Sequence, residues 1–225
     1  MRSRSPSPRR WPDMARIARL DPRFRAETTA LVLFDALAGY LTPTDPEKKA
    51  FLEERKILPN LIRLRDAAKA AGLTVFYPVG RHAADGSDSV ERLTDADMDL
   101  KPAGGPIKPR FAKGSAEVEI AAPLAPAPDD VVVPKHRWSA FHATDLDLHL
   151  RCRGIGNIVL AGGSTDVGIA STAFAARDLD YGLTVVRDCC FSMRGNNNDF
   201  FMDRVFPRMG RVMGVAEAAD LMGDG

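Results

Sequence analysis

Thr29-Ala-Leu-Val-Leu-Phe-Asp35 is the stretch that decides the fold. Residues 30–34 form a short, continuous apolar run, which is typical of a buried strand, and Asp35 ends the run. Apolar residues then recur at helical spacings from Pro46 to Ala71, and this pattern predicts a helix that Pro59 kinks or splits. A buried strand followed by a long amphipathic helix is how a parallel α/β sheet begins.

Further strands and helices alternate along the rest of the chain. The predicted strands are residues 30–34, 73–77, 131–133, 158–160, 183–186 and 211–213. The helices that follow the third to sixth strands are predicted at residues 142–153, 166–179, 199–209 and 215–222. Pro78 and Pro134 are expected to end the second and third strands. This alternation predicts the α/β class, with a Rossmann-like, mostly parallel sheet and helices on both faces. The glycine- and proline-rich stretch between the second and third strands is expected to be a long loop that shapes a binding site.

Charge is distributed unevenly, although the formal net charge of the 225-residue chain is only +1. Residues 1–27 contain eight arginines and three acidic residues, which is a net charge of +5. We expect this segment to be a basic, disordered extension and residues 28–225 to be a single domain. The near-neutral total favours neither nucleic acid nor a membrane as a partner, and no apolar run approaches the roughly 18 residues of a membrane span.

The chain has three cysteines, Cys152, Cys189 and Cys190. An odd number with two adjacent residues does not fit a disulfide framework, and it favours a reducing cytoplasm as the location. Cys189 and Cys190 follow the predicted fifth strand, so either could serve as a thiol nucleophile. Small buried apolar residues are the simpler interpretation of both.

Three features lie where the strands of an α/β sheet present ligands, at their carboxyl ends. Asp35 directly follows the first strand, Lys135 lies two residues after the third, and the turn 162–168 leads from the fourth strand into a helix. An acid, a base and free helix N–H groups are therefore expected to converge on one cleft. Apolar neighbours such as Phe34 and Tyr40 favour a raised pKa for Asp35, which suits proton transfer.

Each feature also has an ordinary structural explanation. A carboxylate after a strand commonly caps a helix, and a lysine there is commonly solvated. Arg137 could clamp a substrate carboxylate or form an ion pair that braces the cleft. Tyr40, Trp138 and Phe141 could line the pocket or pack in the core. His142 and His149 lie on one helix face, but no carboxylate or cysteine completes a ligand set, so no metal is predicted.

Several motifs, in this order, resemble the isochorismatase-like, or cysteine hydrolase, superfamily. They are the strand Thr29–Asp35, the segment Lys135-x-Arg137-x-Ser139-Ala140-Phe141, the strand and turn Gly154–Val167, the residues Ser171-Thr172-Ala173, and the stretch 178–182 before a Val-Val-x-Asp strand. The likeness covers about residues 28–222. It implies a six-stranded parallel sheet flanked by helices, usually assembled into homodimers or homotetramers.

The resemblance also implies roles for individual residues. Asp35 matches the catalytic acid/base, Lys135 its lysine partner, and Gly163-Ser164 a turn that often holds a cis peptide and aims N–H groups at an oxyanion. The nucleophilic cysteine of the superfamily falls on Gly168, so this chain is identified as a member without the thiol. Members that hydrolyse isochorismate also carry glycine there. Leu37 is a further departure, since many members have glutamine at that position.

Metal-using nicotinamidases of the superfamily place an Asp-x-His segment after the second strand. Here that stretch reads Gly80-Arg81-His82-Ala83, without the aspartate two residues before the histidine. We therefore expect neither a metal nor another cofactor.

These observations predict a hydrolase of a small molecule, with Asp35 and Lys135 catalytic and water as the nucleophile. The bond would be a vinyl ether, another ether or a C–N bond. The expected substrate-binding residues are Tyr40, Arg137, Phe141, Gly163 and Ser164. Two alternatives stay open. One is an amidohydrolase with an unusual nucleophile such as Ser164 or Cys189, because without a thiol at position 168 the usual thioacyl intermediate cannot form. The other is a noncatalytic small-molecule-binding or scaffold protein that keeps the fold.

Overall fold

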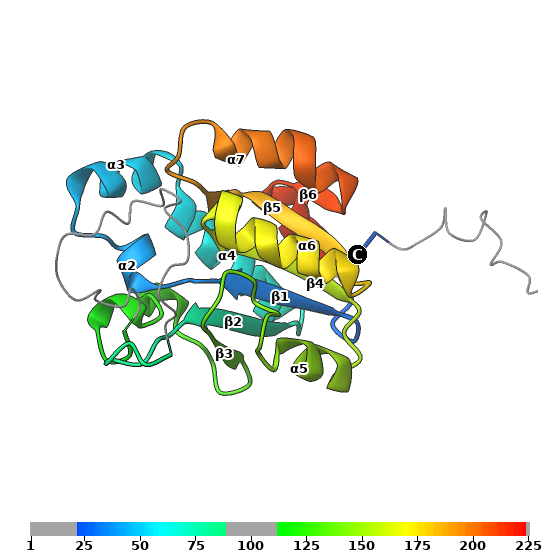
Figure 1. Ribbon diagram of the computed structural model, residues 1–225. Helices are drawn as coiled ribbons and strands as arrows, with labels where there is room; N and C mark the ends of the chain where they lie inside the picture. The colour runs from blue at the N-terminus through cyan, green and yellow to red at the C-terminus, as the bar shows by residue number, and fades with distance from the viewer. Residues whose placement is uncertain (1–21, 89–111, 224–225) are drawn as a thin grey trace, which may run out of the picture.

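A sheet of six strands, all paired in parallel, runs through the computed structural model, which describes residues 22–88 and 112–223 (Figure 1). The strand order is β3-β2-β1-β4-β5-β6. The strands are β1 (Thr29–Phe34), β2 (Thr74–Gly80), β3 (Val131–Lys135), β4 (Asn157–Gly163), β5 (Gly182–Phe191) and β6 (Arg211–Met213). The predicted α/β class and six-stranded sheet are confirmed.

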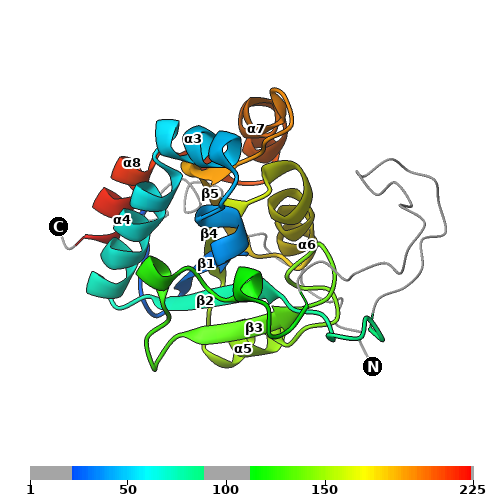
Figure 2. The ribbon, with the colours of Figure 1, turned by 90° about the vertical axis from the view of Figure 1, so that its left-hand side faces the viewer.

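Helices cover both faces of the sheet (Figure 2). They are α2 (Ala38–Leu41), α3 (Pro46–Glu54), α4 (Ile57–Ala70), α5 (Leu146–Cys152), α6 (Ala170–Asp178), α7 (Asn197–Phe200) and α8 (Val215–Met222). Shorter helical turns are η1 (Ala116–Val118), η2 (Ala122–Leu124), the π-helical turns η3 (Thr165–Ile169) and η4 (Phe201–Val205), and η5 (Phe206–Arg208). Alternate residues of β1 enter different cores: Leu31 and Leu33 pack with α4 and α8, whereas Val32 and Phe34 pack with α5 and α6.

The predicted helix at 46–71 is split in two, but the break lies three residues before Pro59. Lys56 adopts a left-handed conformation with a φ of 52° and separates α3 from α4. Pro59 is the third residue of α4, where a backbone N–H would have no partner within the helix, so the proline is tolerated. Asp45 fixes the start of α3, because its side chain accepts hydrogen bonds from the N–H groups of Glu47 and Lys48, both at 3.0 Å.

Strands β2, β3, β4 and β5 extend beyond their predicted ends. Pro78 lies within β2 and Pro134 within β3, so neither proline ends its strand. β3 is an edge strand, and only every second N–H of an edge strand faces a neighbour, which leaves a position for Pro134. β5 extends to Phe191, so the cysteine pair lies inside this strand and not after it.

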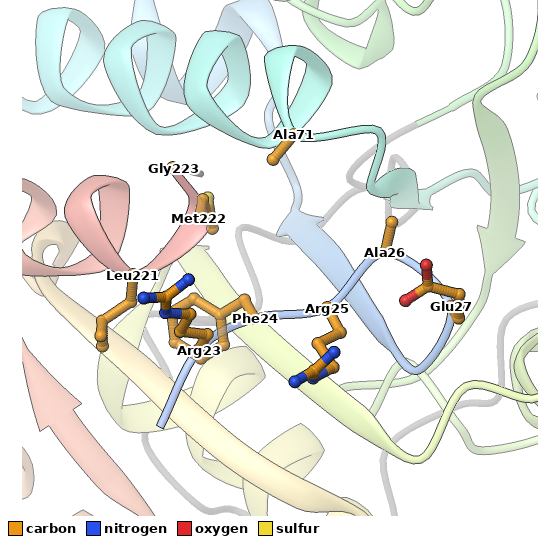
Figure 3. A pocket seen from close by; sticks show the side chains of 9 residues that line it. All are labelled: Arg23, Phe24, Arg25, Ala26, Glu27, Ala71, Leu221, Met222 and Gly223. Carbon is orange, nitrogen blue, oxygen red and sulfur yellow. The ribbon is translucent and has the colours of Figure 1, made fainter. Parts of the chain in front are cut away.

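The packed part of the chain begins before residue 28. Phe24 is buried, its N–H donates to the Leu221 carbonyl at 2.9 Å, and the Arg211 guanidinium lies 4.7 Å from the centre of its ring. This segment and the ends of α4 and α8 line a cavity of about 220 Å³ at the amino edge of the sheet (Figure 3). Residues 1–21 of the predicted extension, and residues 89–111 of the predicted long loop, lie outside the described residues.

Within the described ranges, no helix is both long enough and apolar enough to cross a membrane.

Gly162 brings the end of β4 close to the end of β1. Its φ is +127°, and a Cβ built there would overlap the carbonyl oxygen of its neighbour Phe34. Gly156, at the other end of the strand, would meet nothing within 4 Å. Glycine is therefore required at position 162 for two independent reasons, whereas at position 156 it is not.

We expect Gly162→Ala to lower the free energy of unfolding by about 3 kcal/mol or more, because the substitution combines backbone strain with overpacking against main-chain atoms. Gly156→Ala should change it by less than about 1 kcal/mol. Urea titrations of both variants measure the difference. Equal midpoints for the two variants would show that β4 does not approach β1 as described.

Candidate active site

A buried ion pair lies at the carboxyl edge of the sheet. Asp35 follows the last residue of β1, Lys135 is the last residue of β3, and the Lys135 Nζ lies 2.9 Å from Oδ2 of Asp35. Both residues are only 5% exposed. The other carboxylate oxygen, Oδ1, accepts the N–H of Gly80 at the end of β2, at 2.7 Å. One carboxylate therefore connects the ends of three neighbouring strands.

Asp35 also has an unusual backbone conformation. Its φ is +45°, in the left-handed region that side chains other than glycine seldom adopt. Hydrogen bonds on both sides hold it there, since its N–H donates to the Pro78 carbonyl at 2.9 Å and its carbonyl accepts the N–H of Leu37 at 2.7 Å. Strained backbone of this kind occurs disproportionately at functional positions.

Burial determines the electrostatics of the pair. Desolvation raises the pKa of Asp35 above its ordinary value, and the charge and hydrogen bond of Lys135, with the N–H of Gly80, offset part of that rise. A carboxyl group whose pKa is raised holds a proton more readily than an exposed aspartate. It is therefore better matched to proton transfer near neutral pH.

Hydrogen bonds to the carboxylate of Asp166 hold the turn after β4. The peptide bond between Gly163 and Ser164 is cis, and the Ser164 hydroxyl donates to Oδ1 of Asp166. The Asn197 amide donates to Oδ2 of Asp166 at 2.6 Å. Burial opposes ionisation of Asp166, but hydrogen bonds from Ser164, Asn197 and Ser192 outweigh it and lower the pKa of that carboxyl. Asp166 is thus a weak base, which argues against Ser164 as a nucleophile activated by this neighbour.

Sequence reasoning missed the roles of Asp166 and Asn197. The run Ser164-Thr165-Asp166 directly after two glycines could have indicated a turn closed by side chains, since serine, threonine and aspartate commonly bond to nearby groups in turns. Nothing in the sequence indicates that the partner comes from α7, 31 residues away.

Gly168 lies in η3, buried at the start of the helix that follows the turn. A Cβ built on it would overlap the Cε1 and Cζ atoms of the Phe34 ring. The cysteines lie elsewhere: Cys189 and Cys190 are buried in β5, and burial raises the pKa of both thiols, that of Cys190 to about 12. Neither thiol is therefore a ready nucleophile, and the interpretation of both as small buried residues agrees with this environment.

Three other predicted binding residues, Tyr40, Arg137 and Phe141, have contacts of their own. Phe141 stacks on Tyr181, with ring centres 5.5 Å apart, and Tyr181 precedes β5 at the amino edge of the sheet. This stacking agrees with the interpretation of Phe141 as a packing residue, and its role in substrate binding stays a prediction. Tyr40, in α2, is half-buried against the core that contains α4 and α8.

Arg137 is exposed and donates to the neighbouring carbonyl of His136 at 2.7 Å. It lines a shallow surface depression of about 410 Å³ together with Trp138, Ser139 and His142. Trp138 is 57% exposed, so it is not a core residue. Among the ion pairs of the described residues, none involves Arg137, which leaves the predicted bracing pair without support.

Next to Lys135, two histidines share one carboxylate. Nδ1 of His82 lies 3.2 Å from Oδ1 of Asp88, and Nε2 of His136 lies 3.1 Å from Oδ2. The two imidazoles contact different oxygens of this carboxylate, and the His82 contact is a hydrogen bond. Within residues 22–88 and 112–223, no group of three or more histidine, cysteine, aspartate or glutamate residues is arranged to hold a metal ion.

The isochorismatase domain model matches residues 29–217. The chain belongs to the isochorismatase family. The resemblance predicted from the sequence motifs is confirmed at this level.

Relatives of this isochorismatase-family chain cover most of its length. The isochorismatase family protein YecD of Escherichia coli O157:H7 is 30% identical over 85% of this chain and 95% of its own. Ureidoacrylate amidohydrolase RutB of Rhizobium rhizogenes is 30% identical over 73% of this chain and 71% of its own.

Solved structures agree with these relatives. An isochorismatase family protein from Burkholderia thailandensis has a TM-score of 0.71 and 30% identity, and the match covers 89% of this chain and 98% of that one. N-carbamoylsarcosine amidase from Thermoplasma acidophilum has a TM-score of 0.64 and 26% identity, with 84% and 96% covered. The family is therefore hydrolytic.

We expect either single substitution in the ion pair, Asp35→Asn or Lys135→Met, to lower the free energy of unfolding by about 3–5 kcal/mol, because each leaves a buried group without its partner. The double variant Asp35→Asn/Lys135→Met should recover most of that loss. Urea titrations at pH 7 measure the cycle. If the double variant loses the sum of the two single effects, the two side chains are not coupled.

Proposed function

We propose that this isochorismatase-family chain hydrolyses a small molecule, with Asp35 transferring a proton, Lys135 stabilising negative charge that develops on the substrate, and water as the nucleophile. The observation that carries the proposal is the buried Asp35–Lys135 pair at the carboxyl edge of the sheet. A buried ion pair contributes little net stability relative to packed apolar residues, so stability does not explain it. Charges in a dry site, in contrast, act strongly on a reacting group.

Water as the nucleophile is supported by the surroundings of the pair. Position 168 carries no side chain, and the ring of Phe34 lies against it. In the reaction, the oxygen of water bonds to the electrophilic carbon of the substrate, the bond to the leaving group breaks, and the leaving group receives a proton. Asp35 accepts a proton from water when a C–N bond is cleaved, or donates one to carbon when the substrate is a vinyl ether.

The names of relatives bear on the class of bond. RutB is a ureidoacrylate amidohydrolase, and a structural neighbour is an N-carbamoylsarcosine amidase. These names support a C–N bond, and the name of the family supports a vinyl ether. The alternative with an unusual nucleophile is weaker, because the Ser164 hydroxyl is bound to a weakly basic carboxylate and Cys189 has a raised pKa. A noncatalytic scaffold would have no use for the strained, buried Asp35.

The remaining parts of the proposal concern binding and assembly. We place Gly163 and Ser164 at the substrate, propose that catalysis needs no metal, and propose a cytoplasmic homodimer or homotetramer. Exposed large apolar side chains support assembly: Val132, Trp138, Leu148, Phe174, Met193 and Phe200.

Turnover should change with pH as Asp35 titrates, and the direction of the change should depend on which bond is cleaved. With ureidoacrylate or N-carbamoylsarcosine, we expect turnover to fall as pH falls through a pKa above 3.8, since the ionised carboxylate is the base and burial raises its pKa. With isochorismate, turnover should fall as pH rises through that pKa.

Asp35→Asn should reduce turnover by about 10²–10⁴-fold. Asp35→Asn/Lys135→Met, folded but inactive, is the control for loss of stability. Full activity in either variant would exclude Asp35 as the proton-transfer group.

Thiol reagents and chelators should leave the enzyme active. We expect iodoacetamide to modify Cys152, which is exposed, without loss of turnover, because no thiol belongs to the proposed mechanism. Dialysis against EDTA should change neither turnover nor the melting temperature. The measurement is residual activity together with peptide mapping and elemental analysis. Inactivation that parallels alkylation of one cysteine, or loss of a stoichiometric metal, would contradict the proposal.

A further inference from the structure

Phe34 contacts both the Asp35–Lys135 ion pair and η3, where Gly168 lies. It is the last residue of β1, and its side chain is only 1% exposed. A Cβ built on Gly168 would overlap its ring, and the Lys135 Nζ lies 4.3 Å from the centre of the same ring. The ring therefore contacts both the start of η3 and the ammonium group of the ion pair.

The contact with Lys135 has a clear electrostatic consequence. The ammonium is buried, and its described hydrogen bond goes to Oδ2 of Asp35 at 2.9 Å. The face of an aromatic ring carries negative potential and attracts a cation, more strongly when both are removed from water. The ammonium thus contacts both a carboxylate and the face of an aromatic ring. A ring fixed in the core leaves Nζ little freedom to leave Asp35.

The contact with Gly168 has a steric consequence. Phe34 cannot withdraw easily, because Gly162 brings β4 against its backbone and its ring packs in the core that contains α5 and α6. Any side chain at position 168 would need the volume that the ring fills. Phe34 and Gly168 are therefore a matched pair, in which a large residue on β1 requires the smallest residue on η3.

We propose that Phe34 is the specificity-determining and positioning residue of this site: its ring occupies the place of a side chain at position 168 and holds the ammonium of Lys135 against Asp35. The proposal rests on the function proposed above. With that place filled, the start of η3 cannot supply a group that forms a covalent acyl intermediate. The substrates that remain are those whose scissile bond is attacked directly by water.

A thermodynamic cycle tests the steric part without any substrate. We expect Gly168→Ala to lower the melting temperature by about 4 °C or more when Phe34 is present. In a Phe34→Ala background, the same substitution should leave the melting temperature unchanged or raise it, because alanine favours a helix more than glycine does. Phe34→Leu provides a second background in case the alanine variant does not fold. Equal shifts in all backgrounds would overturn the proposal.

Cysteine labelling tests whether Phe34 and Lys135 lie next to position 168. In a Cys152→Ser background, Phe34→Ala/Gly168→Cys should react with iodoacetamide at position 168 at least about tenfold faster than Gly168→Cys alone. In this reaction the thiolate sulfur bonds to the methylene carbon and iodide leaves. Adding Lys135→Met should slow the labelling, because a nearby ammonium favours the thiolate. Peptide mapping identifies the labelled residue. Labelling that depends on neither Phe34 nor Lys135 would overturn the proposal.

Kinetics test the positioning part, with Phe76→Leu as the matched control. Phe76 is also fully buried in the same core, but it lies on β2 beside Val32 and Val131, earlier along the strands than the ion pair. Using whichever of isochorismate, ureidoacrylate and N-carbamoylsarcosine is turned over, we expect Phe34→Leu to lower kcat about tenfold or more and to displace the pH profile. Phe76→Leu should do neither. Equal effects of both variants would reduce Phe34 to a packing residue. Absence of wild-type turnover on all three compounds would count against the proposed function, and the cycle and the labelling would still decide the role of Phe34.

Discussion

The carboxylate of Asp35 is the point at which the carboxyl edge of the sheet is tied together. It follows β1, accepts the N–H of Gly80 from β2, and pairs with Lys135 at the end of β3. Removing two charges from water is costly, and the cost is offset only when geometry and hydrogen bonds are good. The rest of the edge is consistent with this requirement, since the strained Asp35 backbone is held by Pro78 and Leu37 and both charged side chains are almost fully covered.

Glycines at the end of β4 and in η3 allow close packing against β1, next to Asp35. Gly162 lets β4 approach the backbone of Phe34, and Gly168 leaves space for the ring of the same residue. A Cβ on Gly163 would overlap the ring of Phe191, which places β5 equally close. The close packing at this edge thus requires glycine at several positions. The ring of Phe34 fills the space at position 168 and also contacts Lys135, so it connects the turn 162–168 to the ion pair.

The sequence allowed most of the sheet and two site residues to be predicted, for a simple reason. Buried strands are continuous apolar runs, and the carboxyl ends of parallel strands share one edge, so Asp35 and Lys135 could be placed together from their positions alone. Strand ends were less predictable, because Pro78 and Pro134 lie within paired strands and do not end them. The hydrogen bond from Gly80, the link from Asp166 to Asn197 and the stacking of Phe141 on Tyr181 all join segments distant in the chain. No local pattern encodes such contacts.

The strand order divides the sheet into two consecutive halves of the chain, which are hydrogen-bonded within the sheet only where β1 pairs with β4. Asp35 and Lys135 both belong to the first half, whereas the cis peptide, Gly168 and the Asp166 network belong to the second. The proposed proton-transfer group and the turn that contains position 168 thus come from separate stretches of the sequence. Substitutions in the second half can therefore change the surroundings of position 168 without changing Asp35 or Lys135, and Phe34, which contacts both Gly168 and Lys135, limits which substitutions fit.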